Sequence, residues 1–107
     1  MIVKGIELNN LILTGIEFSF NAKAIAMSFN HHNDQTKEDD LKRIYFHGVK
    51  NVFISHMELG DSSDIKISGV EFEESNEINK ARFNFHTEPP HPEMTLTFDY
   101  VTIKYSW

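Results

Sequence analysis

The sequence predicts an all-β domain, an antiparallel meander of about eight strands that forms a sandwich or a half-barrel. Three observations predict it. Apolar and polar residues alternate along much of the chain, which is the strand period. Turn-forming residues separate the alternating runs at hairpin spacing. The 107 residues are 40% hydrophobic and 12% aromatic, enough apolar surface for one core in a single domain over 1–107.

The expected strands follow one another along the chain. Turn signals between them include Asn21, Gly48, Gly60-Asp61 and Ser75-Asn76. Phenylalanines on the apolar phase, such as Phe18, Phe20 and Phe46, are predicted to lie in the core. The alternating runs before the last strand are 16–20, 25–29, 44–46, 52–54, 65–67, 70–72 and 83–85.

The last strand carries the clearest alternation. Its apolar phase includes Met94, Leu96 and Phe98, and then slips by one residue after Tyr100, so that Val101 begins a new phase. Such a slip predicts a β-bulge near Tyr100-Val101, because half the apolar side chains would otherwise point at water.

The polar segment 30–40 is predicted to be a loop. The best helix candidate is 36–43, where Thr36 could act as a cap and Asp39 stands at the third helical position. It offers only Leu41 and Ile44 to a core, so we expect at most a short helical turn there.

A four-residue pattern occurs three times, as a glycine followed by an apolar residue, glutamate and another apolar residue. The separations of 10 and 54 residues exclude a fixed-period solenoid. We expect each glycine at a bulge or a strand start. The recurrence is either chance reuse of a strand pattern or a contribution of glutamates to an acidic face. The glycines are Gly5, Gly15 and Gly69, and the glutamates are Glu7, Glu17 and Glu71.

Negative charge is concentrated between residues 58 and 77. Seven acids stand there against one base, Lys66, which gives −7 + 1 = −6 and equals the formal net charge of the chain. This predicts a surface for a positively charged partner, with Tyr45 or Trp107 as an aromatic anchor. The alternative is a solvated acidic face, with those aromatics covering the end of the core. The acids are Glu58, Asp61, Asp64, Glu71, Glu73, Glu74 and Glu77.

Other classes of site find little support in the sequence. There is no cysteine, no His-x-His or HExxH spacing and no glycine-rich phosphate loop. Ser55 and His56 are neighbours on an expected strand, so their side chains diverge. We therefore expect no enzyme activity, no cofactor and no metal ion.

Charge and hydropathy predict the surroundings of the chain. Its acidic balance argues against direct binding of nucleic acid or an anionic membrane. No window reaches the roughly 18 apolar residues of a membrane span, and the first residues lack the features of a signal peptide. We expect a cytoplasmic protein.

Two segments suggest a family. Tyr45-Phe46-His47-Gly48-Val49-Lys50-Asn51-Val52 and Ile65-Lys66-Ile67-Ser68-Gly69-Val70-Glu71, together with the closing strand, resemble small all-β immunity proteins of bacterial polymorphic-toxin and contact-dependent growth inhibition systems, over roughly 41–105. The resemblance implies an immunity protein that binds and neutralises a cognate toxin C-terminal domain, a basic domain that is often a nuclease.

Two other functions stay open from the sequence. One is a non-catalytic ligand-binding β domain of the carbohydrate type, which would use exposed aromatics such as Trp107 and Tyr45. The other is a structural or homo-oligomeric subunit that pairs edge strands with further copies.

Overall fold

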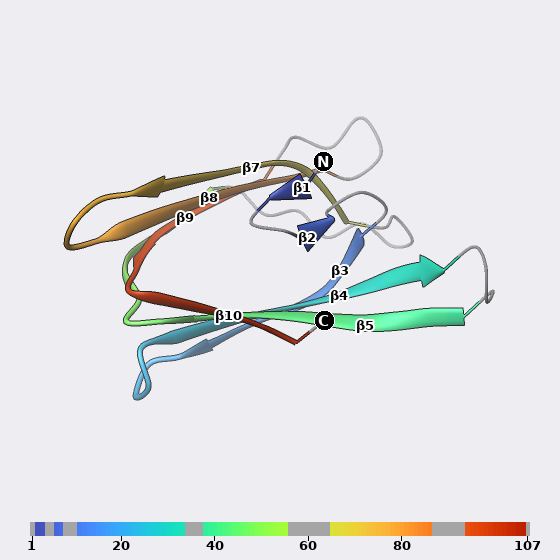
Figure 1. Cartoon of the computed structure of the whole chain (residues 1–107), viewed down its shortest axis with the longest axis horizontal. Helices are drawn as coiled ribbons and strands as arrows, with labels where there is room; N and C mark the ends of the chain where they lie inside the picture. The colour runs from blue at the N-terminus through green and yellow to red at the C-terminus, as the bar shows by residue number, and fades with distance from the viewer. Residues whose placement is uncertain are drawn as a thin grey trace.

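The computed structural model in Figure 1 describes residues 2–3, 6–7, 11–33, 38–55, 65–86 and 94–106. These residues form β-strands and no helix, so no helix within them could span a membrane. The strands are β1 (Ile2–Val3), β2 (Ile6–Glu7), β3 (Leu11–Ser19), β4 (Ala24–Asn33), β5 (Glu38–His47), β6 (Lys50–Ile54), β7 (Lys66–Glu74), β8 (Asn79–His86), β9 (Met94–Tyr100) and β10 (Thr102–Ser106).

The eight longer strands form one antiparallel sheet in the order β10-β5-β4-β3-β7-β8-β9-β6, which is not closed into a barrel. Strands β1 and β2 pair with each other. Figure 1 shows the large sheet folded over, with β3, β4, β5 and β10 in a lower layer and β7, β8 and β9 in an upper one. The predicted all-β fold is confirmed.

The strand order is symmetric about the β3–β7 pair. Strands β3, β4, β5 and β6 occupy positions equivalent to those of β7, β8, β9 and β10. The correspondence extends to the bulges. The β3–β4 register shifts between Leu13 and Gly15, and the β7–β8 register shifts between Ile67 and Gly69. The prediction that these glycines lie at bulges is confirmed for Gly15 and Gly69, while Gly5 lies outside the described residues. The 54-residue separation therefore relates two equivalent hairpins.

The fourth strand of each half pairs with the other half, since β6 pairs with β9 and β10 pairs with β5. His47 pairs with Thr102 and Lys50 pairs with Asp99, so each chain segment contributes two residues between these pairs. The register does not shift there, and the bulge predicted at Tyr100-Val101 is wrong. The apolar phase slips because the chain passes between layers at this corner.

The corner depends on Gly48, whose φ of 69° lies in the left-handed region. A Cβ at this position would lie 2.6 Å from Val101 Cγ2. The Val101 N–H donates to His47 O at 2.9 Å. The register shift near this corner lies instead in β6, between Lys50 and Phe53.

The core lies between the two layers. Phe46 of β5 places its ring against three upper-layer rings, with centroid distances of 5.9 Å to Phe83, 4.7 Å to Phe98 and 5.0 Å to Tyr100. All three pairs are edge-to-face, a geometry that aromatic quadrupoles favour. The fully or nearly buried apolar side chains are Leu11, Ile25, Met27, Phe29, Ile44, Phe46, Val49, Ala81, Phe83, Phe85, Met94, Leu96, Phe98 and Tyr100.

Two phenylalanines predicted to be core are not. Phe20 is 89% exposed because it follows the end of β3 and lies in the β3–β4 turn, and Phe18 is 37% exposed near the end of that strand. Strand alternation continues through Phe20 in the sequence, but the ladder ends at Ser19, paired with Ala24.

The loop predicted for 30–40 is wrong at both ends. Strand β4 continues to Asn33 and β5 begins at Glu38, with Asn33 paired to Glu38 and His31 to Asp40. Residues 38–43 belong to this ladder and form no helical turn, because their backbone groups pair with β4. Residues 34–37 lie outside the described part of the chain.

Candidate functional site

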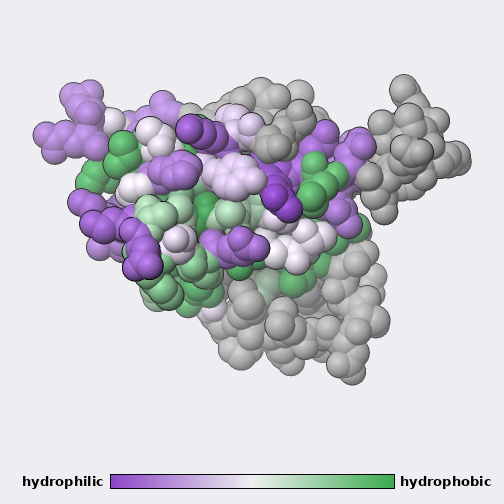
Figure 2. Space-filling view, turned by 90° about the horizontal axis from the view of Figure 1, so that it is seen from below, coloured by the Kyte–Doolittle hydropathy of each residue, from purple (hydrophilic) through white to green (hydrophobic). Residues whose placement is uncertain are grey.

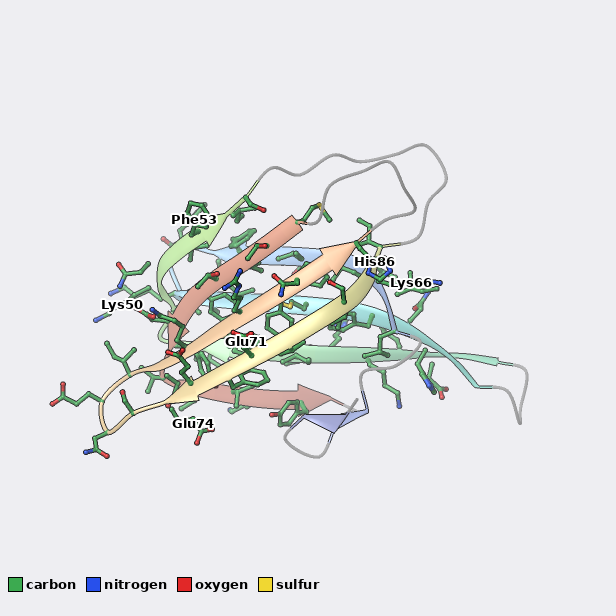
Figure 3. All side chains as sticks on the ribbon, turned by 90° about the horizontal axis from the view of Figure 1, so that it is seen from above. Lys50, Phe53, Lys66, Glu71, Glu74 and His86 are labelled. Atoms are coloured by element: carbon green, nitrogen blue, oxygen red, sulfur yellow. The ribbon has the colours of Figure 1, made fainter. Side chains whose placement is uncertain are left out.

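The outward side of β6, β9, β8 and β7 forms a continuous surface, which we call the upper face (Figure 3). One row of Cα partners crosses all four strands, through Lys50, Asp99, Lys80 and Glu73. The charges alternate in sign, so the row has no net charge at pH 7. Opposite charges on neighbouring strands contribute about 0.2–1 kcal/mol per pair.

A second row lies beside the first and runs through Phe53, Thr97, Arg82 and Glu71. Between the rows is a hollow of about 270 Å³. It is lined by Glu71, Glu73, Lys80, Arg82 and Thr97. The upper face therefore joins an aromatic ring at its β6 side to carboxylates at its β7 side, with two bases between them.

Asp99 is held toward β6 by the bulge in that strand. Asn51 has a φ of 54° and its Nδ2 donates to Asp99 Oδ2 at 2.8 Å. Asparagine tolerates the left-handed region better than most residues, which suits it to this position. The contact fixes the edge strand against the upper face.

The structure describes four of the seven predicted acidic contact residues, namely Glu71, Glu73, Glu74 and Glu77, and all four are exposed. Glu71 and Glu73 lie opposite Arg82 and Lys80, so part of the charge that is unbalanced along the sequence is balanced across the strands. Whether these residues bind a partner stays a prediction. Glu58, Asp61 and Asp64 lie outside the described residues.

One of the two predicted aromatic anchors, Tyr45, does not lie with these acids. Tyr45 is paired with Ala26 and Lys104 on the outward side of the lower layer, which is the opposite face of the molecule. A single flat partner surface could not contact both Tyr45 and Glu71. Trp107 lies outside the described residues.

The lower face that carries Tyr45 is lined by small side chains, among them Ala24, Ala26 and Ser28. Figure 2 shows the molecule from below. Pale side chains lie near the middle of this view, purple ones lie around them, and green hydrophobic ones gather along its lower left margin. Small, uncharged side chains therefore lie on the β4 part of the lower face.

Sequence reasoning missed the longest run of consecutive exposed apolar residues in the described part of the chain, which lies in strand β6. Val52, Phe53 and Ile54 are exposed by 44%, 63% and 42%, and Phe53 stands at the margin of the upper face in Figure 3. Within the described residues β6 has one ladder partner, β9. The sequence indicated it by three successive apolar residues. A strand with one buried and one solvent-exposed side normally alternates apolar and polar residues, so such a run was unexpected.

Within the described residues, no group of three or more His, Asp or Glu side chains could hold a metal ion. Ser55 Oγ accepts a hydrogen bond from the Thr95 N–H at 2.7 Å, which ties it to the end of the β6–β9 ladder.

Comparisons with protein-family models, with curated proteins and with solved structures found no match to this chain. The upper face and β6 are therefore interpreted from their own geometry.

Proposed function

We propose that this chain is a non-catalytic binding protein that neutralises a cognate toxin domain, as an immunity protein of a bacterial polymorphic-toxin system. The partner is a basic domain, of which a nuclease is the best example because its phosphate-binding surface is basic. The proposal places the contact on β6 and the adjoining upper face. It replaces Tyr45 by Phe53 as the aromatic anchor.

The observation that carries the proposal is the exposure of Phe53 on an edge strand. Monomeric proteins usually protect such edges, because their unpaired N–H and C=O groups pair readily with another chain. Large aromatic side chains supply much of the binding energy at protein interfaces, particularly when they are surrounded by polar groups. On the upper face Phe53 pairs with the polar Thr97, and the charged pair Lys50 and Asp99 lies in the neighbouring row.

Charge supports the choice of a basic partner. The chain has a formal net charge of −6, which accelerates encounter with a positive domain over distances of about a Debye length. Glu71 and Glu73 already lie opposite bases of this chain. We therefore expect them to contribute more to the specificity of partner binding than to its affinity. The exposed Glu74 and Glu77, at the β7–β8 turn, extend this acidic margin.

Growth rescue tests the proposal. Candidate toxin domains taken from the genes that neighbour this one are induced in a bacterial host with and without this chain. We expect rescue and a salt-sensitive complex that survives gel filtration. Absence of both rescue and complex would exclude this function. Light scattering of the free chain would show whether β6 pairs copies of the chain instead.

The contact surface is tested by Phe53→Ala, which removes an exposed ring and should weaken the complex by roughly 10-fold or more. The matched control is Leu41→Ala, because Leu41 is 53% exposed but lies on β5 in the lower layer. Equal affinity of the two variants would remove β6 from the interface.

The acidic margin is tested by Glu71→Lys against Glu17→Lys. The two glutamates occupy equivalent positions in the two halves of the sheet, but Glu17 lies on the lower layer opposite Ala26, whereas Glu71 lies on the upper layer opposite Arg82. We expect Glu71→Lys to slow association several-fold more than Glu17→Lys does at low salt. Equal slowing would mean that only net charge matters.

A further inference from the structure

An apolar cavity of about 380 Å³ opens between β3 and β6. It exists because both strands have an open edge there. Strand β3 pairs with β7 only at Ile12 and Lys66, so from Thr14 onward its edge has no ladder partner among the described residues. The lining residues are Leu13, Thr14, Gly15, Ile16, Phe18, Ile54, Ile65, Phe85, Met94, Thr95 and Leu96.

The described lining carries no charged side chain, and its two hydroxyls are already engaged. Thr14 Oγ1 donates to Ser28 O at 3.0 Å, and Thr95 Oγ1 donates to Asn84 Oδ1 at 3.1 Å. A charged ligand would lose its hydration here without gaining a partner, which is costly. An uncharged apolar ligand would lose nothing of this kind.

The equivalent gap between β7 and β10 is occupied by aromatic rings. Tyr105 of β10 occupies the position equivalent to Ile54 of β6. Tyr105 pairs with Ile44 of β5, and Ile54 pairs with Leu96 of β9. Phe72 lies near Tyr100, with ring centroids 6.3 Å apart. Burial raises the pKa of Tyr100, and the neighbouring Tyr105 raises it further. The two halves therefore share a backbone plan, and large rings fill one gap while the other holds the cavity.

We propose that the cavity between β3 and β6 binds an uncharged, apolar small molecule. Its volume lies within the roughly 300–1,000 Å³ of ligand pockets and is over twice the ~150 Å³ that holds one benzene ring. A ligand with two or three rings, or a medium-length alkyl chain, would fit. The site adjoins the proposed partner surface on β6, but the two use different side chains, since Ile54 lines the cavity while the neighbouring Phe53 lies on the upper face.

The first test uses two probes with one skeleton. N-phenyl-1-naphthylamine is neutral, and 1-anilinonaphthalene-8-sulfonate adds a sulfonate to the same rings. Titrations are followed by fluorescence at about 0.5 M salt, where screening reduces repulsion of the anion by the acidic chain. We expect saturable one-to-one binding of the neutral probe, at least 10-fold tighter than that of the anion. Equal binding of both probes, or no saturable binding, would overturn the proposal.

The location is tested by Ile54→Trp, which fills the cavity mouth, against Ile78→Trp in the β7–β8 turn. The two isoleucines are 42% and 43% exposed, so their folding costs should be similar. We expect Ile54→Trp to weaken the neutral probe at least 10-fold and Ile78→Trp less than 2-fold. If Ile54→Trp changed the mass of the chain in solution and left the probe unaffected, a second copy would be the occupant and the proposal would fail.

A measurement on the unaltered protein covers the case in which the variant does not fold. Methyl NMR spectra of the isoleucines are recorded with and without the neutral probe. Ile16, Ile54 and Ile65 line the cavity and should shift, while Ile44 and Ile103 lie away from it and should not. Shifts confined to the latter pair would place the probe elsewhere and refute the site.

Discussion

Replacing Gly48 by alanine tests the corner at which the chain changes layers. Gly48 has a φ of 69°, and left-handed backbone costs an L-residue roughly 1–2 kcal/mol. The new Cβ would also lie 2.6 Å from Val101 Cγ2 and 2.9 Å from Val101 Cβ. Overpacking of this kind costs about 1–3 kcal/mol. We therefore expect Gly48→Ala to lower the free energy of unfolding by about 2–5 kcal/mol.

The assay is equilibrium unfolding in urea. With an m-value of roughly 2 kcal/mol/M, the midpoint should fall by about 1–2.5 M. Gly15→Ala is the control, because a Cβ at Gly15 meets nothing within 4 Å. It should be neutral or stabilise by about 0.4–1 kcal/mol. A loss below about 1 kcal/mol in Gly48→Ala, or equal effects of the two substitutions, would refute the geometry of the corner.

Three further predictions concern stability. Phe46→Ala should cost about 3–5 kcal/mol, because its ring is fully buried, whereas the 89% exposed Phe20→Ala should cost less than about 0.5 kcal/mol in the same urea assay. Asn51→Ala should lower the free energy of unfolding by about 1–2 kcal/mol, because alanine loses the hydrogen bond to Asp99 and tolerates positive φ less well. If Asn51→Gly recovered this stability, the positive φ would be the dominant cause. Burial, with a smaller contribution from a neighbouring tyrosine, raises the pKa of Tyr100 above 10.0, so the folded state holds that proton more tightly and its contribution to stability is lost as pH rises above about 10. Tyr100→Phe should abolish that alkaline loss. It should also stabilise the fold by up to about 1 kcal/mol at pH 7, because the buried hydroxyl has no hydrogen-bond partner among the described residues. A large destabilisation at pH 7 would contradict this expectation.

The strands could be predicted because each half-buried strand repeats its own environment every second residue. Runs at 25–29, 44–46 and 83–85 all lie within strands of the structure. Residues 66–67 and the run at 70–72 belong to one strand, β7, because the bulge before Gly69 changes the apolar phase without ending the ladder. A phase change alone does not tell a bulge from a turn or a corner, which is why Tyr100-Val101 was misassigned.

The candidate site was harder to predict because it depends on pairing across strands. Glu71 and Glu73 belong to an acidic segment of the sequence, and only the β7–β8 register shows the bases opposite them. Tyr45 and the acids were assigned to one surface because the sequence does not show which layer each strand joins. The apolar run around Phe53 was visible, but its exposure follows from the position of β6 at the edge of the sheet.

Hydrogen exchange on the complex with the toxin-like domain tests the account most directly, because it reports which strands the partner covers. The account predicts slower exchange along β6 and over the β7–β8 hairpin, with β4 and β5 unchanged. Protection confined to the lower layer around Tyr45, with β6 unchanged, would contradict the assignment of the upper face.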